Sequence, residues 1–230
     1  MKFKSQVYTA VSGSIGGITY SHNKGGMYTR ARATPTNPSS AAQLAARNAF
    51  GAMALRWRET LSTAQRNSWE NYAALTPVTD KLGEPVLLSG QQMYIRNNTQ
   101  RVRSGLATVD PGPIGGGGTP LTTPVLSVSD AATTFSLAYT NTDDWAGATG
   151  GGLLIQASRQ MAPTINFFKA PFRFAAKVDG AGTPPTSPAT PTSPFADTYS
   201  TGKRVYARCI AVSADGRISD AQIVTALVSP

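Results

Sequence analysis

The sequence predicts an α+β protein with an extended, glycine-rich basic arm over residues 1–38, a helical module over 39–110 and an antiparallel β-sandwich over 121–230. Before residue 111 the apolar residues recur at helical spacing, whereas after residue 120 they alternate with a period of two, which is typical of half-buried strands. Between these regions lies PGPIGGGGTP, residues 111–120, rich in the residues that interrupt helices and strands. We therefore expect a helical region and a strand region joined by a linker.

The net charge is concentrated in the first half of the chain. The 230 residues include 21 Lys and Arg against 12 Asp and Glu, a formal charge of +9 with the single histidine neutral. Residues 1–110 hold 13 basic and 5 acidic side chains, a difference of +8, while residues 111–230 hold 8 and 7, a difference of +1. Such a charge attracts nucleic acid, anionic membranes or acidic protein surfaces. A charged partner is therefore expected to meet the first half.

The N-terminal arm is predicted to be laid out along a surface or folded as a hairpin. Its segments SQVYTAVSG, ITYS and GMYTRAR have strand-like composition, and NKGG between the last two is a turn signal. The arm has too few apolar residues to form a core alone, so we expect another surface to order it. Basic residues interleaved with tyrosine favour an acidic protein surface or single-stranded nucleic acid. The predicted partner-binding residues are Lys2, Lys4, Tyr8, Tyr20, Lys24, Tyr28, Arg30 and Arg32.

The helical module is predicted from three capping boxes, in which a serine hydroxyl and a glutamine side chain satisfy each other's backbone N–H groups at a helix start. The three pairs are Ser40 with Gln43, Ser62 with Gln65, and Ser89 with Gln92. Apolar stripes on the first two helices predict a small core. That core is expected to contain Phe50, Met53, Trp57, Leu61, Trp69 and Tyr72. The third helix, from about Gly90 to Arg103, is polar and basic, so we expect a contact surface there rather than a core element.

The region after residue 120 contains six strand candidates separated by turn signals, which is the pattern of a β-sandwich. They are TPVLSVS, TTFSLAYT, GGLLIQASR, INFFKAPFRFAAKV, KRVYARCIAVS and AQIVTALVS. One loop, GAGTPPTSPATPTSP at residues 180–194, is rich in proline and threonine. Because proline lacks a backbone N–H, we expect this loop to stay out of the sheet as a mobile excursion or an extended contact strip.

The sequence shows no pattern typical of catalysis. The glycine-rich opening lacks the spacing of a phosphate loop or a dinucleotide loop, and His22, the only imidazole, is expected to be an exposed turn residue. Asp143 and Asp144 precede Trp145 and offer a weak case for a cation or glycan site, against the simpler interpretation of a solvated turn. Cys209 lies in an alternating apolar run and is expected to be a buried thiol. We therefore predict a protein that is not an enzyme, with no cofactor and no metal.

No apolar run approaches the ~20 residues that a membrane-spanning helix needs, and the start MKFKSQVYTAV lacks the apolar middle of a signal peptide. We therefore expect a soluble protein that is made in a cytoplasm and has no membrane partner.

Two parts of the chain resemble known families. The ending VYARCIAVSADGRIS resembles the last hairpin of a fibronectin type III or related immunoglobulin-like domain, with Cys209, Ala211 and Ser213 at alternating positions. The strand tyrosine of that family would fall on Val205, whereas the tyrosine here is Tyr206, and Tyr139 stands where a core tryptophan is common. The resemblance implies an immunoglobulin-like sandwich and leaves its subtype open.

The first half is similar to small accessory virion proteins of tailed bacteriophages. The features that carry this resemblance are the basic GSIGGITYSHNKGGMYTRAR opening, the NPSS helix entry with Gln43 and Arg47, and the series Trp57, Leu61-Ser62 and Gln65-Arg66-x-x-Trp69. The resemblance covers about residues 13–105. It implies a structural component of the virion that is made in the bacterial host cytoplasm and binds capsid or other virion proteins. Self-association is also expected, because an arm that cannot fold alone commonly becomes ordered on a neighbour.

Together the two resemblances imply a capsid decoration or cement protein, whose arm and helices dock on the particle and whose sandwich is displayed. A neck or tail component of the virion is the nearest competing role. Two roles outside the virion also fit the sequence: a nucleic-acid-binding protein, through the basic arm, and an adhesin or glycan-binding module, through the loop near Trp145.

Overall fold

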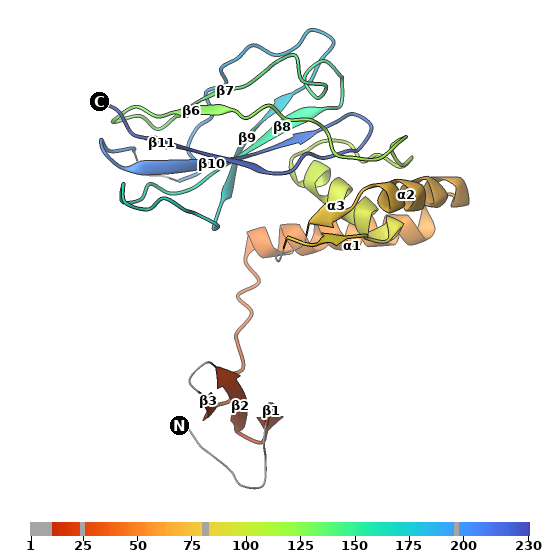
Figure 1. The fold of residues 1–230 in the computed structure, drawn as a ribbon, viewed down its shortest axis with the longest axis vertical. Coiled ribbons are helices and arrows are strands. Elements are labelled where there is room, and N and C mark those ends of the chain that lie inside the picture. Colours follow the sequence, from red (N-terminus) through yellow and green to blue (C-terminus); the bar gives the residue numbers. More distant parts are fainter. Residues whose placement is uncertain (1–10, 24–25, 80–82, 196–197) are drawn as a thin grey trace. The chain divides into compact units, whose positions relative to one another are not determined.

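The structure is a computed structural model that describes residues 11–23, 26–79, 83–195 and 198–230. The chain divides into two compact units, residues 1–43 and residues 44–230, which are described separately. Helices and antiparallel sheets are both present (Figure 1), which confirms the predicted α+β class.

The first unit contains a three-stranded antiparallel sheet in the order β1-β2-β3. Its strands are β1 (Gly13–Ile15), β2 (Ile18–Asn23) and β3 (Gly26–Ala31). Gly16, with φ of 57°, lies in the two-residue turn between β1 and β2, a conformation that glycine adopts without steric cost. Strands β2 and β3 pair in the antiparallel register expected of the predicted hairpin, with Tyr20 opposite Thr29.

The second unit begins with the helical region. It contains α1 (Ala41–Glu59), whose first residues belong to the first unit, α2 (Thr63–Leu75) and α3 (Gly90–Arg103), with a short ribbon of β4 (Val78–Thr79) and β5 (Pro85–Val86) between α2 and α3. The predicted capping boxes are formed at α2 and α3, where Ser62 and Ser89 each accept the N–H of the glutamine three residues later at 3.3 Å. Ser40 and Gln43 form the same reciprocal bonds, at 3.3 and 3.4 Å.

The helical core is centred on Trp69 of α2, which is fully buried. Its ring makes edge-to-face contacts with the rings of Tyr72 and Tyr94, at centroid distances of 5.7 and 5.4 Å, and its indole N–H donates to the carbonyl of Asp110 at 2.8 Å. The buried members of this cluster are Met53, Leu61, Trp69, Tyr72, Ala73, Met93, Tyr94 and Ile95, and Trp57 packs against them partly buried.

Phe50, predicted to be a residue of the helical core, lies on the surface instead, with its side chain 56% exposed. Ala49 and Met53 are the buried residues of α1. The buried stripe of α1 therefore runs one residue away from Phe50, about 100° around the helix. The small Ala49 side chain occupies the inward position and leaves the phenylalanine in solvent.

Helix α3 is the most deeply buried helix, in contrast to the contact surface expected from its polar sequence. Its buried polar side chains bind backbone groups. Asn97 donates to the carbonyl of Gly216 at 3.0 Å, and Asn98 both donates to the carbonyl of Val109 and accepts from its N–H. Arg101, only 2% exposed, donates to three carbonyls, those of Ala107, Ser213 and Gly150, at 2.7, 2.6 and 2.9 Å.

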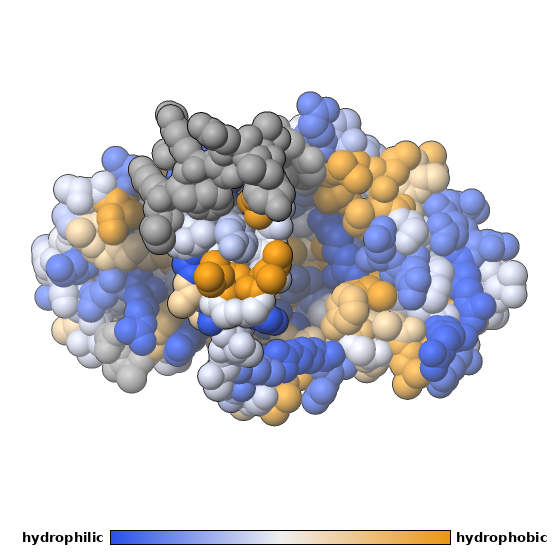
Figure 2. Space-filling view, turned by 90° about the horizontal axis from the view of Figure 1, so that it is seen from below, coloured by the Kyte–Doolittle hydropathy of each residue, from blue (hydrophilic) through white to orange (hydrophobic). Residues whose placement is uncertain are grey.

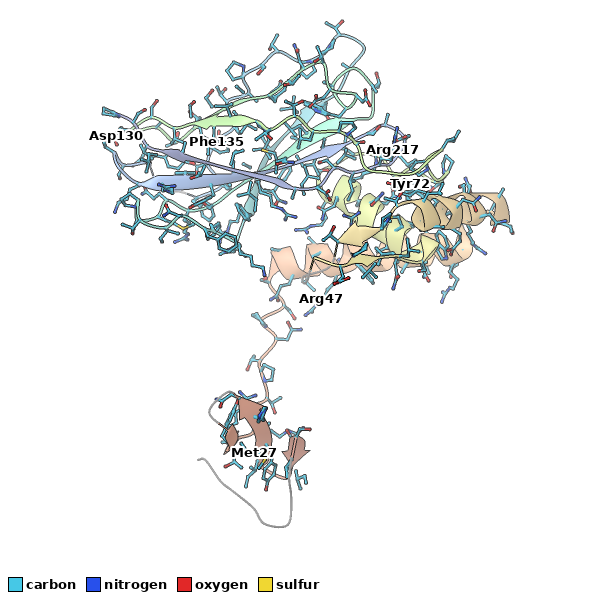
Figure 3. The ribbon with its side chains drawn as sticks, in the orientation of Figure 1. Met27, Arg47, Tyr72, Asp130, Phe135 and Arg217 are labelled. Carbon is cyan, nitrogen blue, oxygen red and sulfur yellow. The ribbon has the colours of Figure 1, made fainter. Side chains whose placement is uncertain are left out.

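These contacts fix the helices to the strand region, and the three helices lie together at one end of the sheet (Figure 1). Figure 3 shows Tyr72 of α2 close to Arg217, which lies in the turn after β10.

The strand region forms a four-stranded antiparallel sheet in the order β11-β10-β8-β9 and a separate ribbon of β6 and β7. The strands are β6 (Val125–Ser127), β7 (Ser136–Ala138), β8 (Gly152–Ala157), β9 (Arg173–Asp179), β10 (Arg204–Val212) and β11 (Gln222–Leu227). Five of the six predicted segments contain one of these strands, and the remaining strand, β9, extends one residue beyond its predicted segment, to Asp179.

Strand β10 lies at the centre of the sheet and is buried on both faces. Val205, Ala207, Cys209 and Ala211 belong to the main core, together with Leu126 and Leu137 of the ribbon and with Trp145. On the other face, Ile210 and Val212 pack with Leu154, Ile218 and Leu106, the last of which follows α3. The segment after α3 thus covers part of the outer face of the sheet.

The proline- and threonine-rich loop pairs with the ribbon instead of staying out of the sheet. Leu137 and Ala189 exchange backbone hydrogen bonds at 2.8 and 3.0 Å, the N–H of Phe135 donates to the carbonyl of Pro191, and that of Ser193 donates to the carbonyl of Thr133. The hydroxyl of Tyr139 donates to Thr186 at 2.7 Å. Because Pro191 supplies a carbonyl and Ala189 and Ser193 supply amides, residues 186–193, named here the proline strip, pair along β7 and its flanks.

The glycine-rich segment 111–120, predicted to be a linker, is bonded to the helices. Gly112 N–H donates to the Ser68 hydroxyl at 2.7 Å, Gly117 N–H donates to the Thr76 hydroxyl at 2.9 Å, and the Tyr72 hydroxyl donates to the Gly117 carbonyl at 2.9 Å. Residues 44–230 form one compact unit that includes this segment.

The close packing of this segment predicts opposite effects of two Gly→Ala substitutions. A Cβ at Gly112 would lie 2.6 Å from backbone atoms of Ser68 and Trp69, so Gly112→Ala should destabilise the fold by about 1–3 kcal/mol. Gly51 lies within α1 with open space around it, so Gly51→Ala should stabilise by about 0.5–1 kcal/mol. Urea unfolding of the two variants measures both effects, and equal changes in the midpoint would contradict this packing.

Candidate functional site

The N-terminal sheet has one apolar face, which follows from its register. Ile15, Ile18 and Ala31 lie directly opposite one another across the three strands, and the same face carries Tyr20 and Met27. His22 and Thr29 complete this face, which bears no Lys, Arg, Asp or Glu among the described residues. Ile15 and Ile18 are 75% and 45% exposed. Figure 3 shows Met27 among the side chains of this sheet.

The other face of the same sheet is polar and basic. Thr19 lies opposite both Ser14 and Arg30, and Ser21 lies opposite Tyr28. The hydroxyls of Ser14 and Thr19 are hydrogen-bonded at 2.8 Å. Arg32 follows β3, and its N–H donates to the carbonyl of Gly17 at 2.8 Å, so the pairing continues one residue past the strand.

The structure therefore separates the predicted arm residues. Tyr28 and Arg30 share the polar face, whereas Tyr20 lies on the apolar face beside the isoleucines. The remaining predicted arm residues, Lys2, Lys4, Tyr8 and Lys24, lie outside the described residues. The isoleucines were missed in the sequence, although the alternation in ITYSHN, read together with the turn at NKGG, contains the signal that places Ile18 and Tyr20 on one face.

A second exposed apolar area lies on α1. Leu44, Phe50 and Leu55 are exposed on this helix, and orange areas separated by blue are visible on the helical side, at the right of Figure 2. A hollow of about 600 Å³ lies beside α1, lined by Gly51, Ala54, Leu55, Trp57, Arg58, Arg66 and Gln91. A neighbouring hollow of about 430 Å³ is lined by Phe50, Gln92, Ile95, Arg96, Thr99 and Gln100. Both hollows are open, shallow features of the surface and do not enclose a reactive group.

One charged cluster joins α1 to the segment after α3. Arg56 binds the carboxylate of Asp110 through Nε at 2.8 Å and through a terminal nitrogen at 2.6 Å, and the Tyr94 hydroxyl donates to the same carboxylate at 3.3 Å. The hydrogen bond from Arg56 lowers the pKa of Asp110, and burial raises the pKa of Tyr94 to about 12. Near neutral pH Arg56 is therefore protonated, Asp110 is ionised and Tyr94 is neutral, as expected of a structural ion pair.

The other residues considered from the sequence do not come together as a site. Trp145 is fully buried in the main core, so its ring is not available to a glycan. Asp143 accepts hydrogen bonds from the backbone and the hydroxyl of Thr122, at 2.9 and 2.8 Å, and fixes a loop. His22 is exposed on β2 rather than in a turn. Burial raises the pKa of the Cys209 thiol to about 12, which suppresses its nucleophilic thiolate form.

Within the described ranges, no group of three or more His, Cys, Asp or Glu side chains is placed to hold a metal ion. The helices found in those ranges are too short or too polar to cross a lipid bilayer.

Comparison with known proteins assigns no family to this chain. No protein-family model matches the chain, and no curated protein matches it. Among solved structures, a β-1,2-glucanase from Parabacteroides distasonis is similar over 50% of this chain at 18% identity, with a TM-score of 0.29. This chain spans 14% of the length of the glucanase chain. So weak a likeness does not show glucanase activity, or any enzyme activity, in this chain.

Proposed function

We propose that this protein is a non-enzymatic structural component of a tailed-bacteriophage virion, most simply a capsid decoration or cement protein. The observation that carries the proposal is the N-terminal sheet, which is ordered as β1-β2-β3 but forms no buried hydrophobic cluster among its described residues. A sheet of this size is marginally stable alone and gains stability by packing on another surface, so it suits docking on other subunits.

The chemistry of the polar face supports docking on an acidic protein surface. Arg30 is exposed on that face, Tyr28 lies beside it in β3, and Arg32 follows. Tyrosine and arginine are favoured at the centres of protein interfaces, where each forms hydrogen bonds as well as apolar contacts. A Cβ added at position 13, 16 or 17 would meet no atom within 4 Å, so the space beside these glycines has room for a neighbouring backbone.

The strand region fits the role of a displayed domain, and we propose that it is an immunoglobulin-like sandwich. Its main core lies between the four-stranded sheet and the β6–β7 ribbon extended by the proline strip. Tyr139 and Trp145 pack together in that core with ring centroids 5.4 Å apart. Two packed antiparallel layers with an aromatic core are typical of that architecture.

The decisive experiment is quantitative mass spectrometry of density-gradient-purified phage particles, in which this chain is counted against the most abundant shell protein. A fixed ratio near that of the shell protein supports capsid decoration, whereas a small fixed ratio supports a neck or tail component instead. Absence of the chain from particles would contradict a virion role.

Removal of the arginines of the polar face should weaken docking. We expect Arg30→Ala combined with Arg32→Ala to reduce occupancy on stripped particles at least tenfold at physiological salt, because both cations would face acidic groups. Arg103→Ala combined with Lys203→Ala is the matched control, since it removes the same charge from two exposed positions of the second unit. Equal loss with both double variants would point to net charge and contradict specific docking by this face.

The polar face also supports a second candidate function, the binding of single-stranded nucleic acid. Tyr28 and Arg30 share this face, and an aromatic ring beside a guanidinium can stack on a base while it contacts a phosphate. Binding of purified protein to single-stranded DNA or RNA, with an affinity that falls steeply as salt increases, would favour this function.

A further inference from the structure

The apolar face of the N-terminal sheet, defined by Ile15, Ile18, Tyr20, Met27 and Ala31, is not used in the polar-face docking described above. Within residues 11–43, none of these side chains belongs to a buried hydrophobic cluster. An orange area is visible at the centre of Figure 2. Burial of such a row of isoleucine, tyrosine and methionine would be strongly favourable, so a face that no described residue covers suits a partner.

The two faces of the sheet differ in charge, and this difference selects the partner. The polar face carries Arg30 and is followed by Arg32, whereas the described residues of the apolar face include no Lys, Arg, Asp or Glu. An acidic partner would find its counter-charges only on the polar face. A partner for the apolar face must itself be apolar and uncharged, because burial of an unpaired charge is costly.

The same face of a second copy meets this requirement. The first half of the chain carries a charge difference of +8, so contacts between two copies through its basic surfaces bring like charges together. The apolar face is the exception, because two copies of it can meet without any Lys or Arg from the face being buried. Stacked sheets pack about 10 Å apart with alternate side chains interdigitated, and the period-two row on β2 provides this geometry.

We propose that the apolar face of the N-terminal sheet packs against the same face of a second copy of the chain, so that the sheet is a self-association module. Each pair then presents two basic faces outward, one from each copy. This inference goes beyond the proposed function, because it concerns the purified protein alone and holds whether or not the chain is part of a virion.

The test is a pair of Lys substitutions on β2, studied in the full chain by sedimentation velocity over a concentration series. Ile18→Lys places a charge on the apolar face, and Ser21→Lys places the same charge on the polar face, opposite the uncharged Tyr28. Thr19 is avoided as the control site, since it lies opposite Arg30 and a lysine there would add like-charge repulsion within the sheet. We expect the wild-type chain and Ser21→Lys to self-associate and Ile18→Lys to weaken association at least tenfold.

A second measurement remains decisive if Ile18→Lys disrupts the sheet itself. Ile18→Cys and Ser21→Cys are milder changes, and the natural thiol of Cys209 is fully buried and so does not interfere. A bis-maleimide with a reach of about 10 Å, the distance between packed sheets, should link two Ile18→Cys chains and leave the Ser21→Cys chains mostly single.

Salt separates this contact from the polar face. Apolar association should persist or strengthen at high sodium chloride, whereas docking through Arg30 should weaken. The inference is overturned if the wild-type chain is monomeric at every concentration, if Ile18→Lys and Ser21→Lys associate equally, or if the two cysteine variants cross-link to the same extent.

Discussion

Arg101→Ala is expected to destabilise residues 44–230 by about 3–5 kcal/mol. The guanidinium connects α3 to the strand region, because it donates to the carbonyls of Ser213 and Gly150 as well as to that of Ala107. Without it these acceptors lose their partner, and a buried acceptor without a partner costs about 1–3 kcal/mol. Burial lowers the pKa of Arg101, which reflects the cost of placing a cation there. The three hydrogen bonds to carbonyl oxygens offset that cost.

Arg103→Ala is the matched control for Arg101. It lies on the same helix two residues later and is exposed, so its loss should change stability by no more than about 0.5 kcal/mol. Arg101→Lys should resemble the alanine variant more than the wild type, because one ammonium cannot reach three separated carbonyls as the planar fork does. Urea unfolding followed by circular dichroism measures all three variants. Wild-type stability of Arg101→Ala would mean that the carbonyls are satisfied in another way.

Trp69→Ala should lower the free energy of unfolding by about 3–5 kcal/mol. The side chain is fully buried, contacts the rings of Tyr72 and Tyr94, and donates its indole N–H to Asp110. Its removal leaves a cavity that the rigid aromatic neighbours fill poorly. It also removes a bond that ties α2 to the start of the glycine-rich segment.

Phe50→Ala is the control for Trp69→Ala, because it removes an aromatic side chain that lies outside the helical core. Because Phe50 is largely in solvent, its loss should change stability by no more than about 0.5 kcal/mol. Thermal unfolding by circular dichroism compares the two variants without reliance on tryptophan fluorescence. A large loss from Phe50→Ala would place that side chain in the core after all and would contradict the observed orientation of α1.

Features with a local cause could be predicted from the sequence. The bounds of α3 follow from the capping box at Ser89 and from Gly105, whose φ of 77° ends the helix. The six strand segments follow from alternation, because a half-buried strand needs an apolar side chain at every second position. Burial of Cys209 followed from the same alternation.

Features that depend on distant backbone could not be predicted in this way. Two of the three carbonyls that accept hydrogen bonds from Arg101, those of Gly150 and Ser213, lie 49 and 112 residues later in the chain, so the polar sequence of α3 gave no sign of its burial. Periodicity could not decide between Ala49 and Phe50, since a shift of one residue on a helix changes the direction by about 100°. The two faces of the N-terminal sheet depended on register, which a single strand does not define.

The proline strip has one further consequence, for the behaviour of many copies held close together. The flank of a sheet attracts strands from neighbouring molecules, and crowding makes such fusion faster. Residues 186–193 occupy the free flank of β7. Ala189 and Pro191 use their backbone groups toward β7, and Pro188, which faces the outer side, lacks the amide hydrogen that a newcomer would need. The strip therefore prevents the addition of further strands to this layer, so that neighbouring copies can be crowded at this flank without pairing their strands into fibrils.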